Sequence, residues 1–237
     1  MIDLLNAVEL LRARAEVRLT EQIQALPQGG AEITCRVGCS ACCRQLVVVS
    51  PMEAHALAEF VAARPELAQR LTQAHAEWRE AIAAHPDLTA RLAAFVESEG
   101  YVPGPEGGAL ELAYWQAQQP CPFLEDDRCS VYPVRPFACL EHHVLSDPAL
   151  CFDDFDQAVP ADTRMEFRAV ANYVGAECYE LPDRLIPLPM ALEYAAAHPD
   201  ERNRTADDEA LLLAMAIGLR QARRALALLM LAQREVS

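Results

Sequence analysis

Four cysteines lie within nine residues in the first part of the chain: Cys35, Cys39, Cys42 and Cys43. The C-x3-C-x2-C spacing of the first three lets their thiolates converge on one point without straining the backbone. Converging thiolates are what a tetrahedral zinc ion or an iron–sulfur cluster requires. The residues between these cysteines are small rather than bulky and apolar, which argues against a chance cluster of buried core cysteines.

Cys43 directly follows Cys42, and adjacent side chains of an extended segment point to opposite sides. The two thiols are therefore not expected to bind the same ion. Cys43 either faces a second metal or remains a free thiol beside the site. A disulfide between the two is disfavoured, because adjacent Cα atoms are about 3.8 Å apart and a disulfide usually spans roughly 4.4–6.8 Å.

A second group of cysteines follows much later in the chain: Cys121, Cys129 and Cys139. Prolines on both sides hold Cys121 in a stiff, extended stretch. Cys129 is predicted to lie just after a hairpin turn, and Cys139 in the first turn of a helix that begins at Pro136. This second group can complete the coordination started by the first and tie two remote parts of the chain together.

Polar residues next to the second group have two interpretations each. Arg135 either donates hydrogen bonds to a thiolate and offsets its charge, or pairs with Glu125 or Asp126 at the surface. If the helix carrying Cys139 continues, one residue of the pair His142 and His143 shares its face as a further ligand. A solvated histidine pair is the alternative, so neither histidine is included among the predicted ligands.

The remaining cysteines, Cys151 and Cys178, show no ligand spacing, and both are expected in the core. The N-terminal segment has no basic stretch that leads into an apolar one, so no secretion signal is expected. The longest apolar runs, 210–219 and 225–232, fall short of the roughly 18 residues that a membrane span needs. We therefore expect a cytoplasmic protein with no membrane partner, in which clustered thiols bind metal or react rather than form disulfides.

The composition excludes several functions. The net charge of −15 argues against a nucleic-acid partner, because binding to phosphates requires a basic surface. All 20 basic residues are arginine. The chain therefore has no lysine for a Walker-A motif and none that could form a Schiff base. A G-x-S-x-G nucleophile motif is also missing. No catalytic residue and no organic cofactor site are identified, and the expected partner is a metal ion; a protein partner is left open.

The first 26 residues carry one apolar stripe with helical spacing. Its apolar residues recur every three or four positions: Leu5, Val8, Leu11, Ala15, Leu19 and Ile23. This pattern predicts an amphipathic helix over 2–26 that ends at the Pro-Gln-Gly-Gly segment 27–30. Further helical patterns occur up to about residue 96, and then over 109–118, 161–178 and 205–234, the last with a weak point at Gly218.

Shorter segments separate these helices. The β-branched run at 46–49 predicts a brief strand. The sequence Ser-Pro-Met-Glu at 50–53 has the N-cap serine, early proline and third-position glutamate of a helix start. Pro65 and Pro86 predict fresh helix starts within the long helical region, and residues 100–108 form a Gly/Pro loop.

The remaining local signals surround the second group of cysteines. Residues 121–132 predict a small hairpin that turns at Asp126 and Asp127. With 237 residues, 52% of them hydrophobic, the chain can bury a sizeable core. The sequence thus predicts a mainly α fold: a single helical domain over 1–237, with irregular cysteine-bearing loops at 35–43 and 121–139, a small β-hairpin and a C-terminal helical region at 205–234.

The cysteine motifs resemble those of a known family. Cys-x3-Cys-x2-Cys-Cys from Cys35 is followed by Cys-Pro-Phe-Leu at 121, Cys-Ser-Val-Tyr at 129 and Arg-Pro-x-x-Cys ending at 139. This combination is similar to the YkgJ-type cysteine-cluster family, described as a zinc- or iron-chelating domain. Ser40 and Leu140 stand where members usually carry glycine and a basic residue. The resemblance implies metal chelation by Cys35, Cys39, Cys42, Cys43, Cys121, Cys129 and Cys139.

The identity of the metal is left open between zinc and iron, including a [4Fe-4S] cluster. Zinc would form a closed structural site of four thiolates, whereas an iron–sulfur cluster would allow redox or substrate-activating roles. The C-x3-C-x2-C spacing also occurs in radical-SAM enzymes, but Ala41 replaces their usual aromatic residue and no alternating strand–helix pattern predicts a barrel.

Two alternatives to a metal-binding protein of unknown role remain. Flagellin lysine methylases are similar in their cysteine pattern, which makes an iron–sulfur-dependent group transferase the first alternative. Those proteins are longer, and this chain has no glycine-rich loop suited to S-adenosylmethionine. The second alternative is a thiol redox switch, in which Cys43 and a surplus cysteine of the second group oxidise reversibly.

Overall fold

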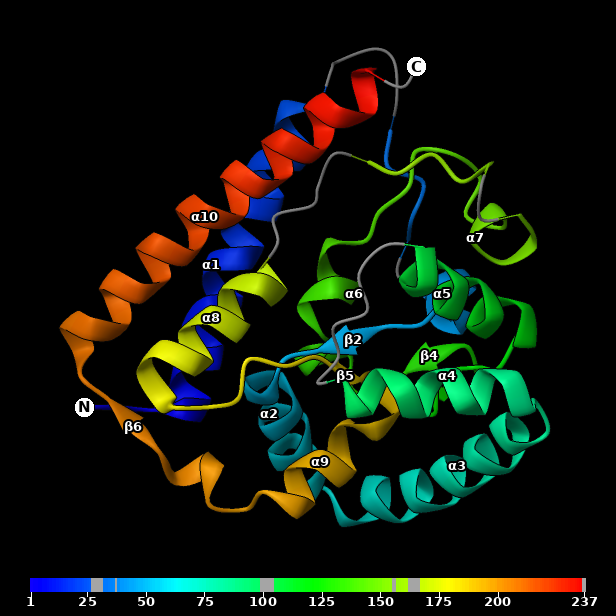
Figure 1. Ribbon diagram of the computed structural model, residues 1–237, viewed down its shortest axis with the longest axis horizontal. Coiled ribbons are helices and arrows are strands. Elements are labelled where there is room, and N and C mark those ends of the chain that lie inside the picture. Colours follow the sequence, from blue (N-terminus) through cyan, green and yellow to red (C-terminus); the bar gives the residue numbers. More distant parts are fainter. Residues whose placement is uncertain (27–31, 37, 99–104, 155–156, 162–166, 236–237) are drawn as a thin grey trace.

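The computed structural model describes residues 1–26, 32–36, 38–98, 105–154, 157–161 and 167–235. Its architecture is mainly helical, as predicted (Figure 1). The α-helices of the described residues are α1 (Leu4–Ala25), α2 (Pro51–Ala62), α3 (Pro65–Ala83), α4 (Pro86–Glu97), α5 (Pro105–Ala117), α6 (Phe137–Glu141), α7 (Leu150–Asp153), α8 (Phe167–Tyr179), α9 (Ala191–Ala197) and α10 (Asp208–Glu235).

Short antiparallel strand pairs join segments that are mostly far apart in the sequence. They are β1 (Ile2–Asp3) with β6 (Thr205–Ala206), β2 (Val48–Val49) with β5 (Ile186–Pro187), and β3 (Leu124–Glu125) with β4 (Arg128–Cys129). Turns of 3-10 helix complete the structure: η1 (Ala41–Arg44), η2 (Tyr132–Val134), η4 (Leu188–Met190) and η5 (Glu201–Asn203).

Helix α1 begins two residues later than its apolar pattern predicts. Ile2 and Asp3 pair with β6, and the Asp3 carboxylate then caps the helix by accepting a hydrogen bond from the Asn6 backbone nitrogen at 2.9 Å. The buried stripe also differs from the predicted one, because Ile23 is 41% exposed. The buried residues of α1 are Leu4, Ala7, Val8, Leu11, Ala15 and Leu19. The predicted stop at 27–30 lies outside the described residues.

Helices α1, α8 and α10 pack side by side on one flank of the molecule (Figure 1). Gly218 of α10 allows a close approach to α8, because a Cβ atom there would lie 3.2 Å from side-chain atoms of Tyr173 and Val170. Gly218, which the sequence predicts to be a weak point of the helix, is thus a point of contact between two helices. The predicted start of the last helix at residue 205 is too early, because residues 205–206 pair with β1 and α10 begins at Asp208. The predicted start of the preceding helix at 161 adjoins residues 162–166, which lie outside the described residues.

Helix α2 starts as its sequence predicts. Ser50 is the N-cap, its hydroxyl accepts from the Glu53 backbone nitrogen, and the Glu53 carboxylate accepts in return from the Ser50 backbone nitrogen. The predicted fresh starts at Pro65 and Pro86 are also confirmed. Helix α9, which packs on α2, is absent from the sequence prediction. Its seven residues are too few to display a helical period.

Helices α3, α4 and α5 form a second layer, seen to the right of α2 in Figure 1. Their shared core includes Trp78, whose indole nitrogen donates a hydrogen bond to the Tyr114 hydroxyl at 3.0 Å. Helix α5 begins at Pro105, four residues before the predicted start, within the predicted Gly/Pro loop. This layer leads directly into the hairpin that carries Cys121 and Cys129.

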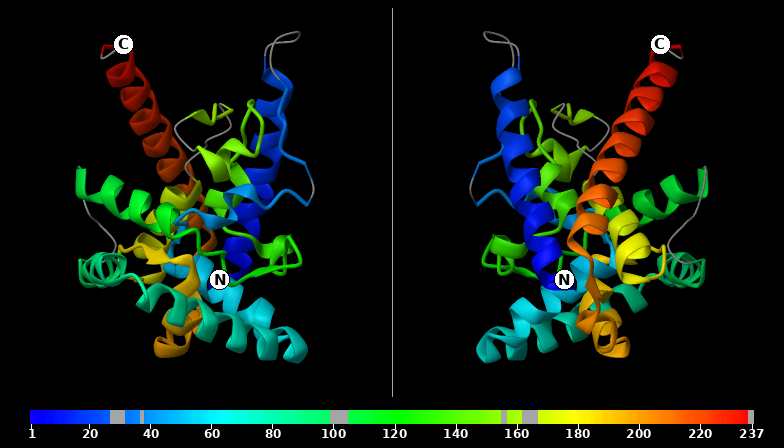
Figure 2. Two further views of the ribbon diagram at one scale, coloured as in Figure 1. Left: turned by 90° about the vertical axis from the view of Figure 1, so that its right-hand side faces the viewer. Right: turned by 90° about the vertical axis from the view of Figure 1, so that its left-hand side faces the viewer.

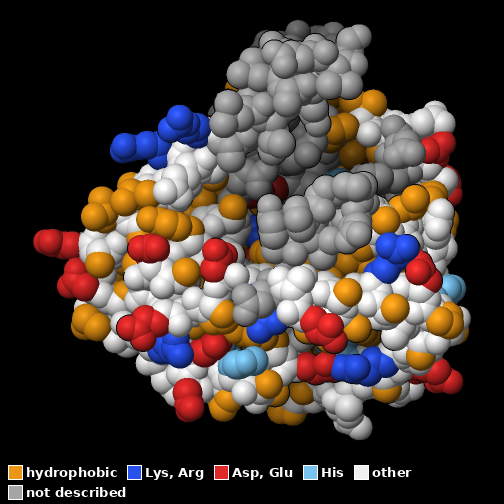
Figure 3. Space-filling view, in the orientation of Figure 1, with side chains coloured by type: hydrophobic (Ala, Val, Ile, Leu, Met, Phe, Trp, Pro, Cys, Tyr) orange, Lys and Arg blue, Asp and Glu red, His pale blue; other side chains and the backbone are white. Residues whose placement is uncertain are grey.

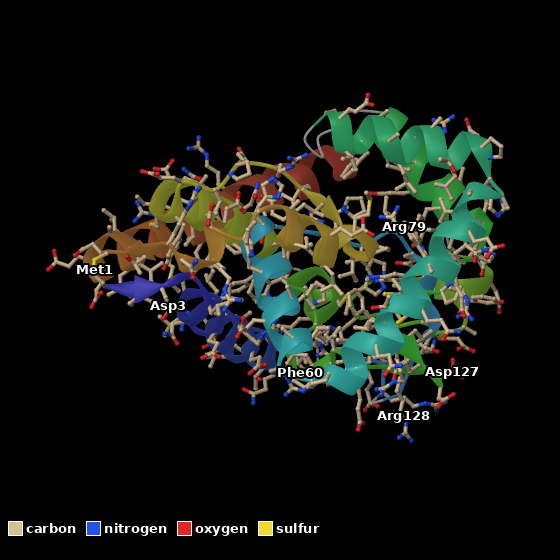
Figure 4. The ribbon with its side chains drawn as sticks, turned by 90° about the horizontal axis from the view of Figure 1, so that it is seen from below. Met1, Asp3, Phe60, Arg79, Asp127 and Arg128 are labelled. Atoms are coloured by element: carbon tan, nitrogen blue, oxygen red, sulfur yellow. The ribbon has the colours of Figure 1, made fainter. Side chains whose placement is uncertain are left out.

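The predicted hairpin at 121–132 is confirmed, with Asp126 and Asp127 at its turn. Their φ angles are +46° and +57°, the left-handed conformation that a two-residue hairpin turn of type I′ requires and that aspartate tolerates. Figure 4 labels Asp127 and Arg128 on the opposite side of the molecule from Met1 and Asp3.

Helix α6 carries Cys139 after Pro136, as predicted, but it ends at Glu141. His142 has extended backbone angles, φ −83° and ψ 109°. The helix therefore does not continue through His142 and His143, and the condition under which one of them would share the face of Cys139 is not met. The short bridge between Val144 and Pro160 pulls the chain into an extended path directly after the helix.

The surface reflects the composition. Acidic side chains are spread over the face seen in Figure 3, in keeping with the net charge of −15. Figure 2 shows the C-terminal ends of α1 and α10 at one end of the molecule and α3 at the other. In the described ranges, no helix combines the length and the apolar character that crossing a bilayer demands.

Candidate metal centre

The two predicted cysteine groups meet at one cavity of about 660 Å³. Two segments that are remote in the sequence thus converge, as the metal-binding hypothesis expects. The cysteines that line this cavity are Cys39, Cys42, Cys43, Cys121, Cys129 and Cys139. Cys35 lies beside it: its sulfur accepts a hydrogen bond from the Val144 backbone nitrogen at 3.4 Å.

Hydrogen bonds hold the two cysteine-bearing segments together directly. The backbone nitrogen of Cys121 donates to the backbone oxygen of Cys43 at 2.8 Å. The Ser40 hydroxyl donates to the Asp127 carboxylate at 2.9 Å, which joins the first loop to the tip of the hairpin. Since these bonds use backbone and hydroxyl groups, they leave every thiol available to a ligand.

Cys42 and Cys43 do not lie in an extended segment, so the expectation that they point to opposite sides is wrong. They belong to the 3-10 turn η1, in which successive side chains are separated by about 120°. Both therefore reach the same cavity. The hydrogen bond to the Cys43 thiol, together with burial and the charge of Cys43, raises the pKa of the Cys42 thiol.

The hairpin brings Cys121 and Cys129 to the cavity. The Ser130 backbone nitrogen donates to the Phe123 backbone oxygen at 2.8 Å, which closes the hairpin just beyond Cys129. Burial raises the pKa of the Cys121 thiol to about 12, and it also raises the pKa of Cys129. Both thiols pack against the core formed by residues of α2, α3 and α9.

Cys139 is held in the cavity by the start of α6. The Phe137 backbone nitrogen lies in the first helical turn, where backbone donors have no partner within the helix, and it donates to the buried Glu53 carboxylate at 2.8 Å. Burial raises the pKa of the Cys139 thiol well above its ordinary value, and the nearby charges of Cys42 and Cys121 raise it further.

Arg135 supplies positive charge at this site. Its guanidinium stacks 4.1 Å above the Tyr132 ring and lines the cavity. Its charge partly counteracts the rise in pKa of Cys42 and Cys129, because it favours their thiolates. Of its two predicted surface partners, Glu125 instead pairs with Arg70 at 3.3 Å. The position of Arg135 therefore favours the interpretation in which it offsets thiolate charge.

Sequence reasoning missed the proximity of Cys151 to these thiols. Cys151 is buried, as predicted, but it lies in α7, which packs against η1. Burial raises its pKa to about 11, and the charges of Cys42, Cys35 and Cys39 contribute. Its sulfur is 3.9 Å from Nε2 of His142, which lines the cavity. Only this local His-x8-Cys spacing could have hinted at the proximity, and that spacing alone is weak.

Cys178 occupies a different region. It packs against the core shared by α1, α8 and α10, and its thiol donates to the Ala210 backbone oxygen at 3.8 Å. This agrees with its predicted place in the core. All nine cysteines of the chain are free thiols in the structure.

The donor set suits a thiophilic ion better than a hard cation. Six thiols line the cavity, and Arg135 balances part of the charge that their thiolates would carry. Among the described residues, however, no three cysteine, histidine or acidic side chains are arranged to hold an ion as they stand. The chemistry of the donors therefore fits zinc or iron, while binding requires proton loss and side-chain rotation.

Residues 34–155 match the sequence model of the family CxxCxxCC, described as a putative zinc- or iron-chelating domain. The match covers just over half of the chain and includes both cysteine groups, so the chain belongs to this family. The predicted YkgJ-type resemblance is thereby confirmed, and family membership supports metal binding. No curated protein matches the chain, and no solved structure matches it.

Proposed function

We propose that the protein binds zinc or iron through cysteines of both groups, and that the bound metal ties residues 35–43 to residues 121–139. The proposed ligands are the predicted ones: Cys35, Cys39, Cys42, Cys43, Cys121, Cys129 and Cys139. The convergence of six of these thiols on one cavity is the observation that carries the proposal. When bound, zinc would supply a closed structural tie, and an iron–sulfur cluster would supply electron transfer or Lewis acidity.

The residues around the thiols have defined roles in this proposal. Arg135 offsets the charge of the thiolates, and the apolar residues Leu46, Val48 and Leu188 line the same cavity. Glu53 fixes the start of α6 and thereby the position of Cys139. A reducing cytoplasm suits this set of nine free thiols, because metal binding there competes with protons rather than with disulfide formation.

We also propose that the chain forms a single domain around the centre. The strand pairs support this, because β1 with β6 joins residues 2–3 to 205–206 and β2 with β5 joins 48–49 to 186–187. Both pairs connect the N-terminal part of the chain to segments that follow the matched family region, which ends at residue 155. A protease-resistant core that retains both ends of the chain would support a single domain.

Elemental analysis of anaerobically purified protein tests the metal proposal. Zinc in a colourless protein, or iron with broad visible absorbance, is the expected result. Cys39→Ser should lose metal, whereas Cys178→Ser, a matched change in a remote thiol, should keep it. A metal-free wild-type protein that changes electrophoretic mobility on oxidation would instead support a thiol redox switch.

The size of the cavity favours a second candidate function, an iron–sulfur-dependent group transferase. A cavity of about 660 Å³ is within the range of small-molecule sites, and an ion with its thiolates fills only part of it. Isothermal titration of the iron-loaded protein with S-adenosylmethionine tests for the cosubstrate of such a reaction. Saturable heat that disappears in Arg135→Ala would support the enzyme, and the absence of binding would argue against it.

A further inference from the structure

We propose that the cavity also binds a small organic carboxylate, whose charged group pairs with Arg168 and whose apolar part lies against the apolar lining. The cavity of about 660 Å³ is larger than an ion with its thiolates needs, and it has the size of a small-molecule site. This binding goes beyond the proposed metal binding and does not require the metal to be present.

The start of α8 places Arg168 at the cavity. Arg168 is the second residue of α8 and is among the residues that line the cavity. The backbone nitrogen of the preceding residue, Phe167, donates to the Glu141 carboxylate of α6 at 2.7 Å. Glu141 is buried, so this bond fixes the first turn of α8 beside the helix that carries Cys139.

Helix stability does not account for an arginine at this position. A cation in the first turn lies at the positive end of the helix dipole, where it is unfavourable. A carboxylate partner does not account for it either, because the arginine salt bridges of the described residues engage other side chains: Arg18, Arg70, Arg79, Arg91 and Arg202.

The nearby Glu53 carboxylate is already occupied. Burial raises the pKa of Glu53, and the charge of Arg168 counteracts part of that rise. One oxygen of Glu53 accepts from the Phe137 backbone nitrogen, and the other accepts from the backbone nitrogen and hydroxyl of Ser50. The guanidinium donors of Arg168 are therefore available to a ligand.

The charged residues that line the cavity favour an anion over a cation. Among the described residues of the lining, Arg128, Arg135 and Arg168 are cationic, and Asp127 is the one carboxylate. Asp127 accepts a hydrogen bond from the Ser40 hydroxyl. This local excess of positive charge, in a chain with a net charge of −15, attracts anionic ligands. Arg135 offsets thiolate charge, which leaves Arg168 for the carboxylate.

The apolar lining specifies the rest of the ligand. Tyr114 and Phe123 are almost completely buried, and they line the cavity together with Leu46, Val48 and Leu188. An inorganic anion would leave these side chains uncovered, whereas a carboxylate with an aliphatic or aromatic group covers them. The planar guanidinium binds a carboxylate through two parallel hydrogen bonds.

Isothermal titration with a matched series of ligands tests the proposal. Hexanoate has both parts of the expected ligand, acetate lacks the apolar chain, 1-hexanol lacks the charge, and hexylammonium carries the opposite charge. We expect saturable binding of hexanoate to zinc-loaded and to chelator-treated protein. The dissociation constants of acetate and 1-hexanol should be larger by about tenfold or more, and hexylammonium should give no saturable heat.

Variants of the arginine locate the charged group. Arg168→Gln should weaken hexanoate binding by about tenfold or more, because it removes a charge-assisted hydrogen bond. The control is Arg14→Gln at an exposed position of α1, which should bind hexanoate as the wild type does. Zinc content, measured by inductively coupled plasma mass spectrometry, should be the same in both variants. Circular dichroism establishes that each is folded.

The outcomes separate this proposal from the proposed function. Zinc-loaded protein without saturable hexanoate binding, or with 1-hexanol bound as tightly as hexanoate, would overturn the carboxylate site while metal binding stands. Arg168→Gln that loses zinc but keeps hexanoate would show that Arg168 serves the thiolates instead. A wild type that binds hexanoate in the expected pattern but takes up no metal would overturn the metal proposal alone. Since the ligand series is decisive in the wild type, a poorly folding variant does not protect the proposal.

Discussion

The Glu53 carboxylate and the Phe137 backbone nitrogen are joined by a hydrogen bond of 2.8 Å. Glu53 lies in the first turn of α2, and Phe137 is the first residue of α6. One buried carboxylate therefore caps two helices at once, because its second oxygen accepts from the Ser50 backbone nitrogen and hydroxyl, each at 2.9 Å. Through this contact the capping box of α2 also fixes the helix that carries Cys139.

Glu53→Gln should destabilise the fold. The amide of glutamine can accept on one side only, so its NH2 group would face either the Phe137 or the Ser50 donors. A buried donor without an acceptor costs about 1–3 kcal/mol, and we expect a loss of this size in the free energy of unfolding, measured by urea denaturation. The control is Glu59→Gln on the same helix, an exposed residue paired with Arg202, for which the loss should stay below about 1 kcal/mol. Equal losses in the two variants would contradict a special role for Glu53.

Removal of metal should lower the melting temperature of the wild type. The metal binds the folded arrangement of two remote segments, so its binding free energy adds to the stability of the fold. Cys39→Ser should melt at the temperature of the chelator-treated wild type and should not respond to the chelator. Cys178→Ser should respond as the wild type does. A wild type whose melting is insensitive to a strong chelator would contradict a structural tie.

Metal affinity should increase with pH. Burial raises the pKa of Cys121 to about 12 and that of Cys139 well above its ordinary value, so both thiols are protonated near neutral pH in the metal-free protein. Each proton that the metal displaces changes the apparent binding constant by about tenfold per pH unit. Competition with a coloured chelator at about pH 6 and about pH 8 measures the slope. A flat profile would mean that no buried thiol loses its proton on binding.

The stability of the metal-free protein should have the opposite dependence on pH. A thiol whose pKa is raised by folding ionises more readily in the unfolded chain, whose cysteines keep a pKa near 9.0. The contribution of these protonated thiols is therefore fully present below a pH of 9.0, and it is lost as the pH rises from there through the folded-state pKa, which is about 12 for Cys121. The urea concentration at the midpoint of unfolding of the metal-free protein should fall as the pH rises above 9.0. A midpoint that rises over the same interval would contradict the raised pKa values.

Gly218→Leu should destabilise the contact between α8 and α10. A Cβ atom at this position already lies 3.2 Å from Tyr173 and Val170 side-chain atoms, and leucine adds three further carbons to the same space. We expect a loss on the order of 1–3 kcal/mol from overpacking, which outweighs the better helix propensity of leucine. Ala216→Leu, an exposed change on the same helix, should be nearly neutral in urea denaturation. A more stable Gly218→Leu would show that the two helices can separate without cost.

The features that sequence predicts well are local. The capping residues Ser50 and Glu53 lie three residues apart. Pro65 and Pro86 each lie in the first turn of the helix whose start they predict. Asp126 and Asp127 themselves have the left-handed backbone conformation of the turn. The mainly α fold follows from such signals together with helical periodicity. The cysteine clusters were found in the same way, because the spacing of their members is visible along the chain.

The features that sequence missed depend on distant segments. Cys151 approaches the site because α7 packs on η1, a contact across more than a hundred residues. The 3-10 turn that brings both Cys42 and Cys43 to one cavity is bonded to the distant Cys121 through the Cys43 backbone oxygen. Helix α6 ends shortly before the bridge between Val144 and Pro160. The start of α1 differs from its apolar pattern for the same reason, because Ile2 pairs with a strand near the other end of the chain.

The main-chain bond from the Cys121 nitrogen to the Cys43 oxygen has a consequence for the maturation of the protein. This bond forms between atoms that neither redox conditions nor metal supply can alter. A newly synthesised chain can therefore form the cavity first and bind its metal ion afterwards. Exchange of one ion for another then requires rotation of side chains and transfer of thiol protons, while the backbone bond between the two segments stays in place.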